Sequence, residues 1–69
     1  MIIKLTNAVG QHLGKTLLLN TEHILSIGDV TTEDGRETTT IFSVDKEIWE
    51  VQESASQIFD MINQKRKLF

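Results

Sequence analysis

Residues 48–62 read IWEVQESASQIFDMI, and this stretch decides the fold because its hydrophobic period changes partway along. Trp49 and Val51 alternate with polar neighbours, which is the two-residue period of a half-buried strand. Ser54 and Gln57 then have the spacing of a capping box, which marks the start of a helix. Apolar residues follow at the spacing of one helix face, namely Ala55, Ile58, Phe59 and Ile62. We therefore predict a strand that leads directly into a capped amphipathic helix.

Four apolar stretches before this segment have the composition and alternation of strands. They cover residues 1–6, 15–20, 24–31 and 38–44. Two glycines in residues 7–14 predict a connection between the first pair of strands, which we expect to form an antiparallel hairpin. The pair Asp34-Gly35 predicts a type I′ turn between the later strands, because both central residues of that turn have positive φ.

The third stretch has a second interpretation. Ile24 and Ile27 are three residues apart, which also suits a single helical turn. The stretch is short and is interrupted by Gly28, so we favour a strand.

Together these elements predict the α+β class. We expect a small antiparallel β-meander of about five strands, curled or barrel-like, with one C-terminal helix over residues 54–67 packed on it. The expected inward residues of the first two strands are Ile3, Leu5, Leu17 and Leu19. The opposite face is also apolar, through Ile2, Leu18, Ile41 and Ile48. A sheet that is apolar on both faces indicates either closure into a small barrel or contact with a second copy of the chain.

The chain has 69 residues and no cysteine. We interpret residues 1–69 as one small domain with a short basic C-terminal tail. A domain of this size buries only roughly 60% of the surface of its unfolded chain, and without cysteine it has no disulfide or thiolate zinc site to stabilise it. We therefore predict a homo-oligomer.

Several features of the sequence predict a cytoplasmic protein. The lack of cysteine fits a reducing compartment. The first residues do not have the basic segment and long apolar run of a signal peptide. No apolar run approaches the roughly 20 residues that span a bilayer, so we expect no membrane span.

Charge is distributed unevenly along the chain. Residues 1–53 carry nine carboxylates and four cations, whereas residues 54–69 carry three cations and one carboxylate. A net-acidic body repels a phosphate backbone, so we expect no generic nucleic-acid binding. A specific pocket for a small molecule such as a nucleotide remains open.

The sequence contains no pattern typical of an active site or a metal site. His12 and His23 are the only histidines, and neither has partners at the spacing of a zinc site, which needs three or four ligands. Glu50 and Glu53 are a possible acid/base pair, but that chemistry requires one desolvated carboxylate, which the sequence does not indicate. We therefore predict no enzyme activity, no catalytic residues, no cofactor and no metal.

Two features are candidates for binding a protein partner. The ring of Trp49 belongs either to the core or to a binding hot spot. The cations at the end of the chain either complement the helix dipole or form, with the final phenylalanine, a peptide that docks on a partner or an acidic surface. The candidate partner-binding residues are Trp49, Lys65, Arg66, Lys67 and Phe69.

The order of several short motifs resembles the FlbD-like family of small flagellar proteins. The matching residues are Ile3-Lys4-Leu5-Thr6, Leu19-Asn20, Ile24 with Ile27, and Val51-Gln52-Glu53-Ser54 followed by Ile58 and Ile62. The resemblance implies a small cytoplasmic protein without enzyme activity that is associated with swarming and flagellar motor output. Similar short chains also occur among phage and mobile-element proteins.

These observations predict a non-enzymatic cytoplasmic protein-interaction or regulatory module, similar to flagellar motility accessory proteins. The alternative is a phage or mobile-element protein. Such a protein would bind a host factor, or would capture a small ligand such as a nucleotide between its subunits.

Overall fold

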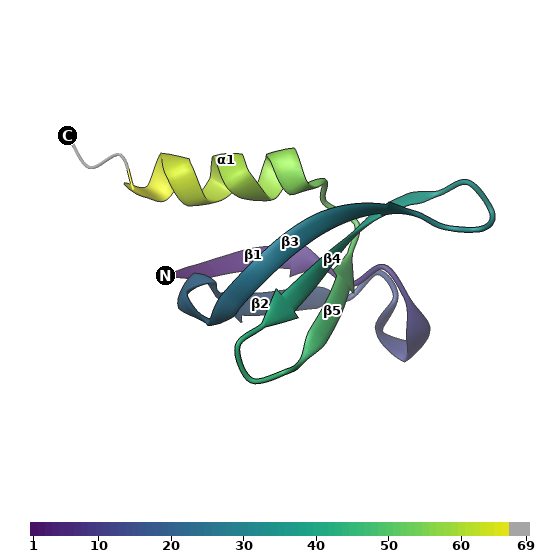
Figure 1. The fold of residues 1–69 in the computed structure, drawn as a ribbon, viewed down its shortest axis with the longest axis horizontal. Helices are drawn as coiled ribbons and strands as arrows, with labels where there is room; N and C mark the ends of the chain where they lie inside the picture. The colour runs from purple at the N-terminus through teal and green to yellow at the C-terminus, as the bar shows by residue number, and fades with distance from the viewer. Residues whose placement is uncertain (67–69) are drawn as a thin grey trace.

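Residues 1–66 are described by the computed structural model, and their side chains are described through residue 64. This part of the chain forms five strands followed by one helix (Figure 1). The elements are β1 (Ile2–Thr6), β2 (Thr16–Asn20), β3 (Ile24–Thr31), β4 (Glu37–Ser43), β5 (Ile48–Val51) and α1 (Ala55–Arg66), with short 3-10 turns η1 (Gly10–His12) and η2 (Thr21–His23). The α+β class is confirmed, and β3 is a strand as predicted. No helix within residues 1–66 is both long enough and apolar enough to cross a membrane.

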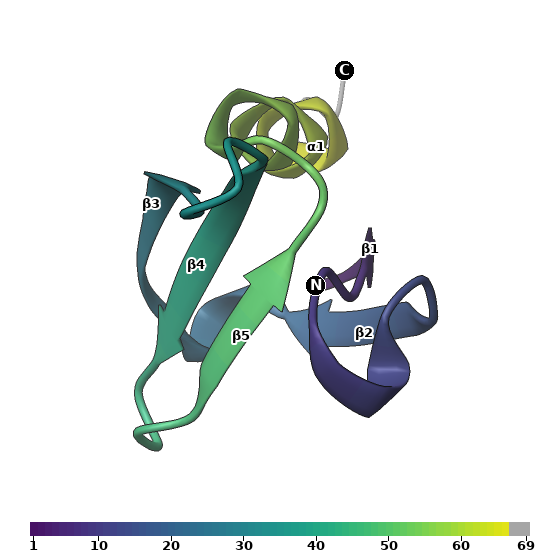
Figure 2. The ribbon, with the colours of Figure 1, turned by 90° about the vertical axis from the view of Figure 1, so that its right-hand side faces the viewer.

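The five strands form two antiparallel sheets instead of one meander. β1 pairs with β2, and β3, β4 and β5 follow one another in the second sheet. The sheets meet where β1 and β5 end, through an isolated bridge between Asn7 and Val51. Beside this bridge, the Ala8 N–H donates to the Glu50 carbonyl at 2.9 Å. Figure 2 shows the two sheets on either side of the molecule, with α1 lying across the top.

The predicted barrel-like closure is wrong. A barrel would require pairing between β2 and β3, the strands at the two free ends of this arrangement. The Thr21 N–H donates to the Met1 carbonyl at 2.8 Å, which extends the β1–β2 register by one residue, and the η2 turn then separates β2 from β3. β3 therefore pairs with β4 alone among the described strands, and its other edge is open.

An apolar core lies between the two sheets and α1. Its buried members are Ile3, Leu5, Leu19, Ile41, Val51 and Ile58. Leu17 is partly buried against this cluster, so the predicted inward residues of β1 and β2 are confirmed. Ile41 was expected on the opposite face, and that expectation is wrong. Its cross-strand partner is Trp49, and residues directly opposite each other in an antiparallel pair share a face.

The helix α1 buries a narrower face than its sequence indicates. Ile58 is fully buried, and Met61 and Ile62 are partly buried against the core. Phe59 was expected in this buried stripe but is 65% exposed. Adjacent helical residues are rotated by about 100° from each other, so a stripe centred on Ile58 places Phe59 at its border.

The connection from β5 into α1 is fixed at both of its ends. The predicted capping box is confirmed, because the Ser54 N–H donates to Gln57 Oε1 at 2.8 Å and the Gln57 N–H donates to Ser54 Oγ at 3.1 Å. One residue earlier, the Glu53 carboxylate binds Thr6 with both oxygens. Oε1 accepts from the Thr6 N–H and Oε2 accepts from its hydroxyl, both at 2.9 Å. Glu53 therefore joins the end of β1 to the start of the helix.

The turn between β3 and β4 differs from the predicted type I′ turn. Gly35 has a φ of +86°, but Asp34 is not among the residues with positive φ. The Gly35 N–H donates to the Thr32 carbonyl at 3.0 Å, which gives a type I turn followed by a glycine bulge. The Thr32 hydroxyl also donates to the Asp34 carboxylate, and this hydrogen bond, with help from Arg36, lowers the pKa of Asp34 below its usual value.

Candidate functional site

The predicted partner-binding residues do not form one described site. Trp49 is half-buried and packs against the core, so its ring belongs mainly to the interior. Lys65 and Arg66 are the last two residues of α1, and their side chains lie outside the described part of the chain. Lys67 and Phe69 also lie outside the described residues. The partner-binding role of the C-terminal residues therefore stays a prediction.

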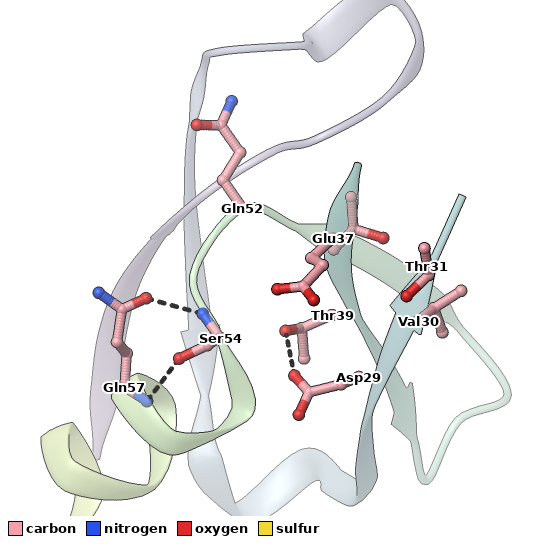
Figure 3. Close-up of a pocket in the computed structure, with 9 residues that line it drawn as sticks. Asp29, Val30, Thr31, Glu37, Thr39, Gln52, Ser54 and Gln57 are labelled. Atoms are coloured by element: carbon pink, nitrogen blue, oxygen red, sulfur yellow. Dashed lines mark hydrogen bonds between the residues drawn. The ribbon is translucent and has the colours of Figure 1, made fainter. Parts of the chain in front are cut away.

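A polar hollow of about 260 Å³ lies between the β3–β4 ribbon and the start of α1 (Figure 3). Asp29 lies in its wall, where its Oδ1 accepts from the Ala55 N–H at 3.0 Å and from the Thr39 hydroxyl at 3.3 Å. A carboxylate is favourable there because the first turn of a helix carries partial positive charge. The lining residues are Asp29, Val30, Thr31, Glu37, Thr38, Thr39, Gln52, Ser54 and Gln57.

A second carboxylate, that of Glu37, shares this polar hollow. Figure 3 shows it pointing into the space between Thr39 and Ser54. Asp29 is held by the helix start, whereas the described residues give the Glu37 carboxylate no hydrogen-bond donor. Two carboxylates surrounded by hydroxyl and amide groups suit a ligand with hydroxyl groups or positive charge, and they repel a phosphate.

An apolar groove of about 580 Å³ lies between α1 and β3. Its lining residues are Ile27, Ala55, Ser56, Phe59, Asp60 and Ile62. Phe59 is the large exposed side chain that lines the groove. Ile27 and Ile62 are partly buried, because they also pack against the core. The groove is therefore apolar at its base and polar at its rim, where Ser56 and Asp60 are exposed.

The outer face of the sheets is also apolar, as the sequence predicts for three of the four residues. Phe42 of β4 lies directly opposite Ile48 of β5, and they are 42% and 62% exposed. On β1 and β2, Ile2 is 52% exposed and Leu18 is 65% exposed. These residues are open to contact in the single chain.

Sequence reasoning missed the groove because it placed Phe59 in the core. Met61 is the residue that indicates the correct face, because it lies three residues after Ile58 and therefore on the same side of the helix. Including Met61 moves the centre of the apolar stripe to Ile58 and leaves Phe59 at the border. Asp29 was also missed, although a carboxylate between Gly28 and Val30 in an apolar strand is unusual.

Glu50 and Glu53, the possible acid/base pair, both form hydrogen bonds with threonines, and the two histidines lie at the surface. Glu50 accepts from the Thr38 hydroxyl at 3.2 Å, and Glu53 holds Thr6. His12 and His23 are exposed in η1 and η2. Among the described residues, no three histidine, cysteine, aspartate or glutamate side chains gather in a way that could hold a metal ion.

Comparison of the chain with protein-family models, curated proteins and solved structures found no match. The resemblance of residues 51–54 to the FlbD-like motif therefore stays a prediction. The structure gives this motif a local physical explanation. Val51 is buried in the core, Glu53 binds Thr6, and Ser54 caps the helix.

Proposed function

We propose that the chain is a non-enzymatic protein-interaction module that binds other proteins through apolar surface left uncovered in the single chain. One observation carries this proposal. Within the described side chains, ten large apolar residues are 42–71% exposed, against six residues in the buried core cluster. Scattered exposed apolar side chains are normal, whereas those that line a shared hollow mark interaction sites, and this criterion selects Phe59 at the apolar groove from the ten. The ten are Ile2, Val9, Leu13, Leu18, Leu25, Val30, Phe42, Val44, Ile48 and Phe59.

The apolar groove is the part of this surface that best fits a partner. It combines a hollow with an exposed aromatic side chain, Phe59, and a polar rim. Buried aromatic anchors surrounded by polar residues are the usual arrangement of a binding hot spot. The carboxylates Glu50 and Glu53 are engaged by threonines, which supports a structural role for them and a module without catalysis.

The cellular role we propose is that of a cytoplasmic accessory to flagellar motility. Its support is the resemblance of residues 51–54 and of the first strand to the FlbD-like family. Deleting the gene should then change swarming and leave growth in liquid unchanged. Unchanged swarming would reject the flagellar role without affecting the interaction role.

The interaction role is tested by immobilising the protein and identifying what it retains from a lysate of its own cells. We expect Phe59→Asp to lose specific retained proteins. The matched control is Ile48→Asp, because Ile48 is exposed to nearly the same degree, 62% against 65%, on the outer face. Identical retained proteins for the wild type and Phe59→Asp would contradict the assignment of the groove.

The polar hollow supports a second candidate, capture of a small ligand. Its carboxylates, Asp29 and Glu37, favour amines and polyols over nucleotides. A thermal-shift screen tests this candidate, since a molecule that binds the folded form raises the midpoint by mass action. We expect any increase in the thermal midpoint to disappear in Glu37→Ala. A nucleotide that raises the midpoint of this variant and of the wild type equally would show that it does not bind in the polar hollow.

A further inference from the structure

We propose that a second copy of this chain docks along the open edge of β3, joining two three-stranded sheets into one of six strands. Phe59 of each copy then covers the apolar groove of the other. This proposal rests on the proposed function to the extent that it uses the same groove, and it names the occupant of that groove.

The open edge of β3 can accept another strand. Thr32 and Arg36 form a hydrogen-bonded pair at the end of the hairpin, with 2.7 Å between the Thr32 nitrogen and the Arg36 oxygen. Hydrogen-bonded and non-bonded pairs alternate along an antiparallel ladder. The backbone N–H and C=O groups of Thr31, Asp29 and Ile27 therefore point away from β4, toward the open edge.

β3 has only part of the protection that edge strands usually carry, namely a bulge between Ile24 and Ser26 and the inward-facing carboxylate of Asp29. It has eight residues, ILSIGDVT, without proline, lysine or arginine. Natural edge strands are protected by prolines, lysines, bulges, inward-pointing charges, short length or a covering segment, and beyond its bulge β3 keeps a regular register from Ser26 to Thr31. Leu25 and Val30 of β3 are 71% and 42% exposed, which makes this edge apolar as well as unpaired.

Two-fold symmetry brings the edge and the groove together. α1 begins beside Asp29 and passes Ile27 at the groove, so it runs antiparallel to β3. A two-fold axis through the edge of β3 pairs the strand with its own copy in antiparallel order and places both helices on the same face of the sheet. Phe59 of one helix then lies against the groove of the other, and both grooves are filled by one operation.

Charge complementarity favours this antiparallel arrangement of helices. The start of α1 lies beside the Asp29 carboxylate, and Asp60 lies on the rim of the groove. The last two residues of the helix are Lys65 and Arg66. Antiparallel helices place the end of each helix, whose sequence is Lys65-Arg66, toward the start of the other, where the Asp29 carboxylate of β3 lies.

The exposed apolar area is on the scale that a small dimer needs. A standard interface takes about 800 Å² from each partner, roughly a sixth of the 5081 Å² that the chain exposes. Phe59 alone contributes roughly 130 Å², given its 65% exposure and the area of an aromatic side chain. Leu25, Val30 and the eight-residue strand edge add the backbone and aliphatic area along β3.

Sedimentation equilibrium over a range of micromolar concentrations tests this proposal. We expect the wild type to dimerise and Phe59→Asp to weaken the dimer at least ~30-fold, the effect of losing one hot-spot residue. Thr31→Pro removes an outward N–H without breaking a bond to β4, and the loss of that hydrogen bond should weaken the dimer roughly 10-fold. Ile48→Asp, on the outer face, should dimerise like the wild type.

Circular dichroism establishes that each variant is folded, which we expect because the changed side chains are exposed. A wild-type chain that stays monomeric would overturn the second-copy proposal. If Phe59→Asp nevertheless loses retained cellular proteins, the groove binds another protein and the proposed function stands. A dimer that survives Phe59→Asp and is lost with Ile48→Asp would also overturn the proposal, because the copies would then meet through the outer face.

Discussion

Replacement of Glu53 by alanine tests the contact that holds the helix start to the first sheet. Glu53 accepts two hydrogen bonds from Thr6 at 2.9 Å, one from the backbone and one from the hydroxyl. Hydrogen bonds to a charged group contribute about 1.5–3 kcal/mol each, but both residues here are only partly buried, so water replaces some of that loss. We expect Glu53→Ala to lower the free energy of unfolding by about 2–3 kcal/mol.

The assay is thermal and urea unfolding followed by circular dichroism. A loss of that size lowers the midpoint temperature of a domain this small by roughly 10–20 °C. Thr6→Val removes the hydroxyl bond alone and should cost about 1 kcal/mol. In the double variant the two losses should not add, because both changes remove the same hydrogen bond.

Glu47→Ala is the matched control for this experiment. It removes the same charge from an exposed side chain, and its effect should lie within about 0.5 kcal/mol of zero. If Glu53→Ala is no more destabilising than Glu47→Ala, the carboxylate does not join β1 to the helix and the reasoning is refuted.

Three further predictions follow from the helix face, the turn and its carboxylate. Ile58→Ala should lower the free energy of unfolding by about 2–5 kcal/mol, because Ile58 is fully buried. Phe59→Ala, measured on the monomeric protein, should lower it by less than about 1 kcal/mol, because Phe59 is exposed. Gly35→Ala should cost about 1 kcal/mol, because alanine at a φ of +86° is strained. Thr32→Val should raise the pKa of Asp34 toward its ordinary value in an NMR titration, because the threonine hydroxyl is the largest cause of its lowering.

A second residue in the same protein serves as the control for each of these three predictions. Equal losses for Ile58→Ala and Phe59→Ala would contradict the observed helix face. Gly28→Ala should not destabilise, because Gly28 has no positive φ and nothing within 4 Å of an added Cβ. Asp45, whose pKa is lowered mainly by the Ser43 hydroxyl, should keep its pKa in Thr32→Val.

The pH dependence of stability follows from the direction of these two shifts. A carboxyl group whose pKa is lower in the folded state stabilises the fold above its unfolded pKa. That contribution is lost as the pH falls through the folded value. Asp34 and Asp45 therefore contribute to stability near neutral pH and stop contributing in acid, below their ordinary value of 3.8.

Local sequence patterns were sufficient to predict the strands and the helix start. Alternation of side chains placed Ile3 and Leu5 on the inner face, and the capping residues Ser54 and Gln57 marked the helix. These features depend on neighbours within a few residues, which a sequence displays directly. The division into two sheets was not predictable in this way, because it depends on long-range contacts such as the bridge between Asn7 and Val51.

The apolar groove and the polar hollow could not be predicted from the sequence, for a different reason. Whether Phe59 or Ile58 faces the core depends on a rotation of the helix by about one residue, and both choices leave an amphipathic pattern. Ile41 similarly takes its face from its partner Trp49 across the sheet. The groove and the polar hollow both arise where α1 meets β3, so no single stretch of sequence contains either site.

The most direct test of partner docking at the groove and the β3 edge is amide hydrogen exchange at different protein concentrations. The N–H groups of Ile27, Asp29 and Thr31 point to the open edge, whereas those of Gly28 and Val30 are bonded to β4 and serve as internal references. We expect the three outward amides to become protected as the concentration rises, and to lose that protection in Phe59→Asp. Free exchange of the outward amides at every concentration, in the wild type as in the variant, would contradict docking of a second copy at this edge.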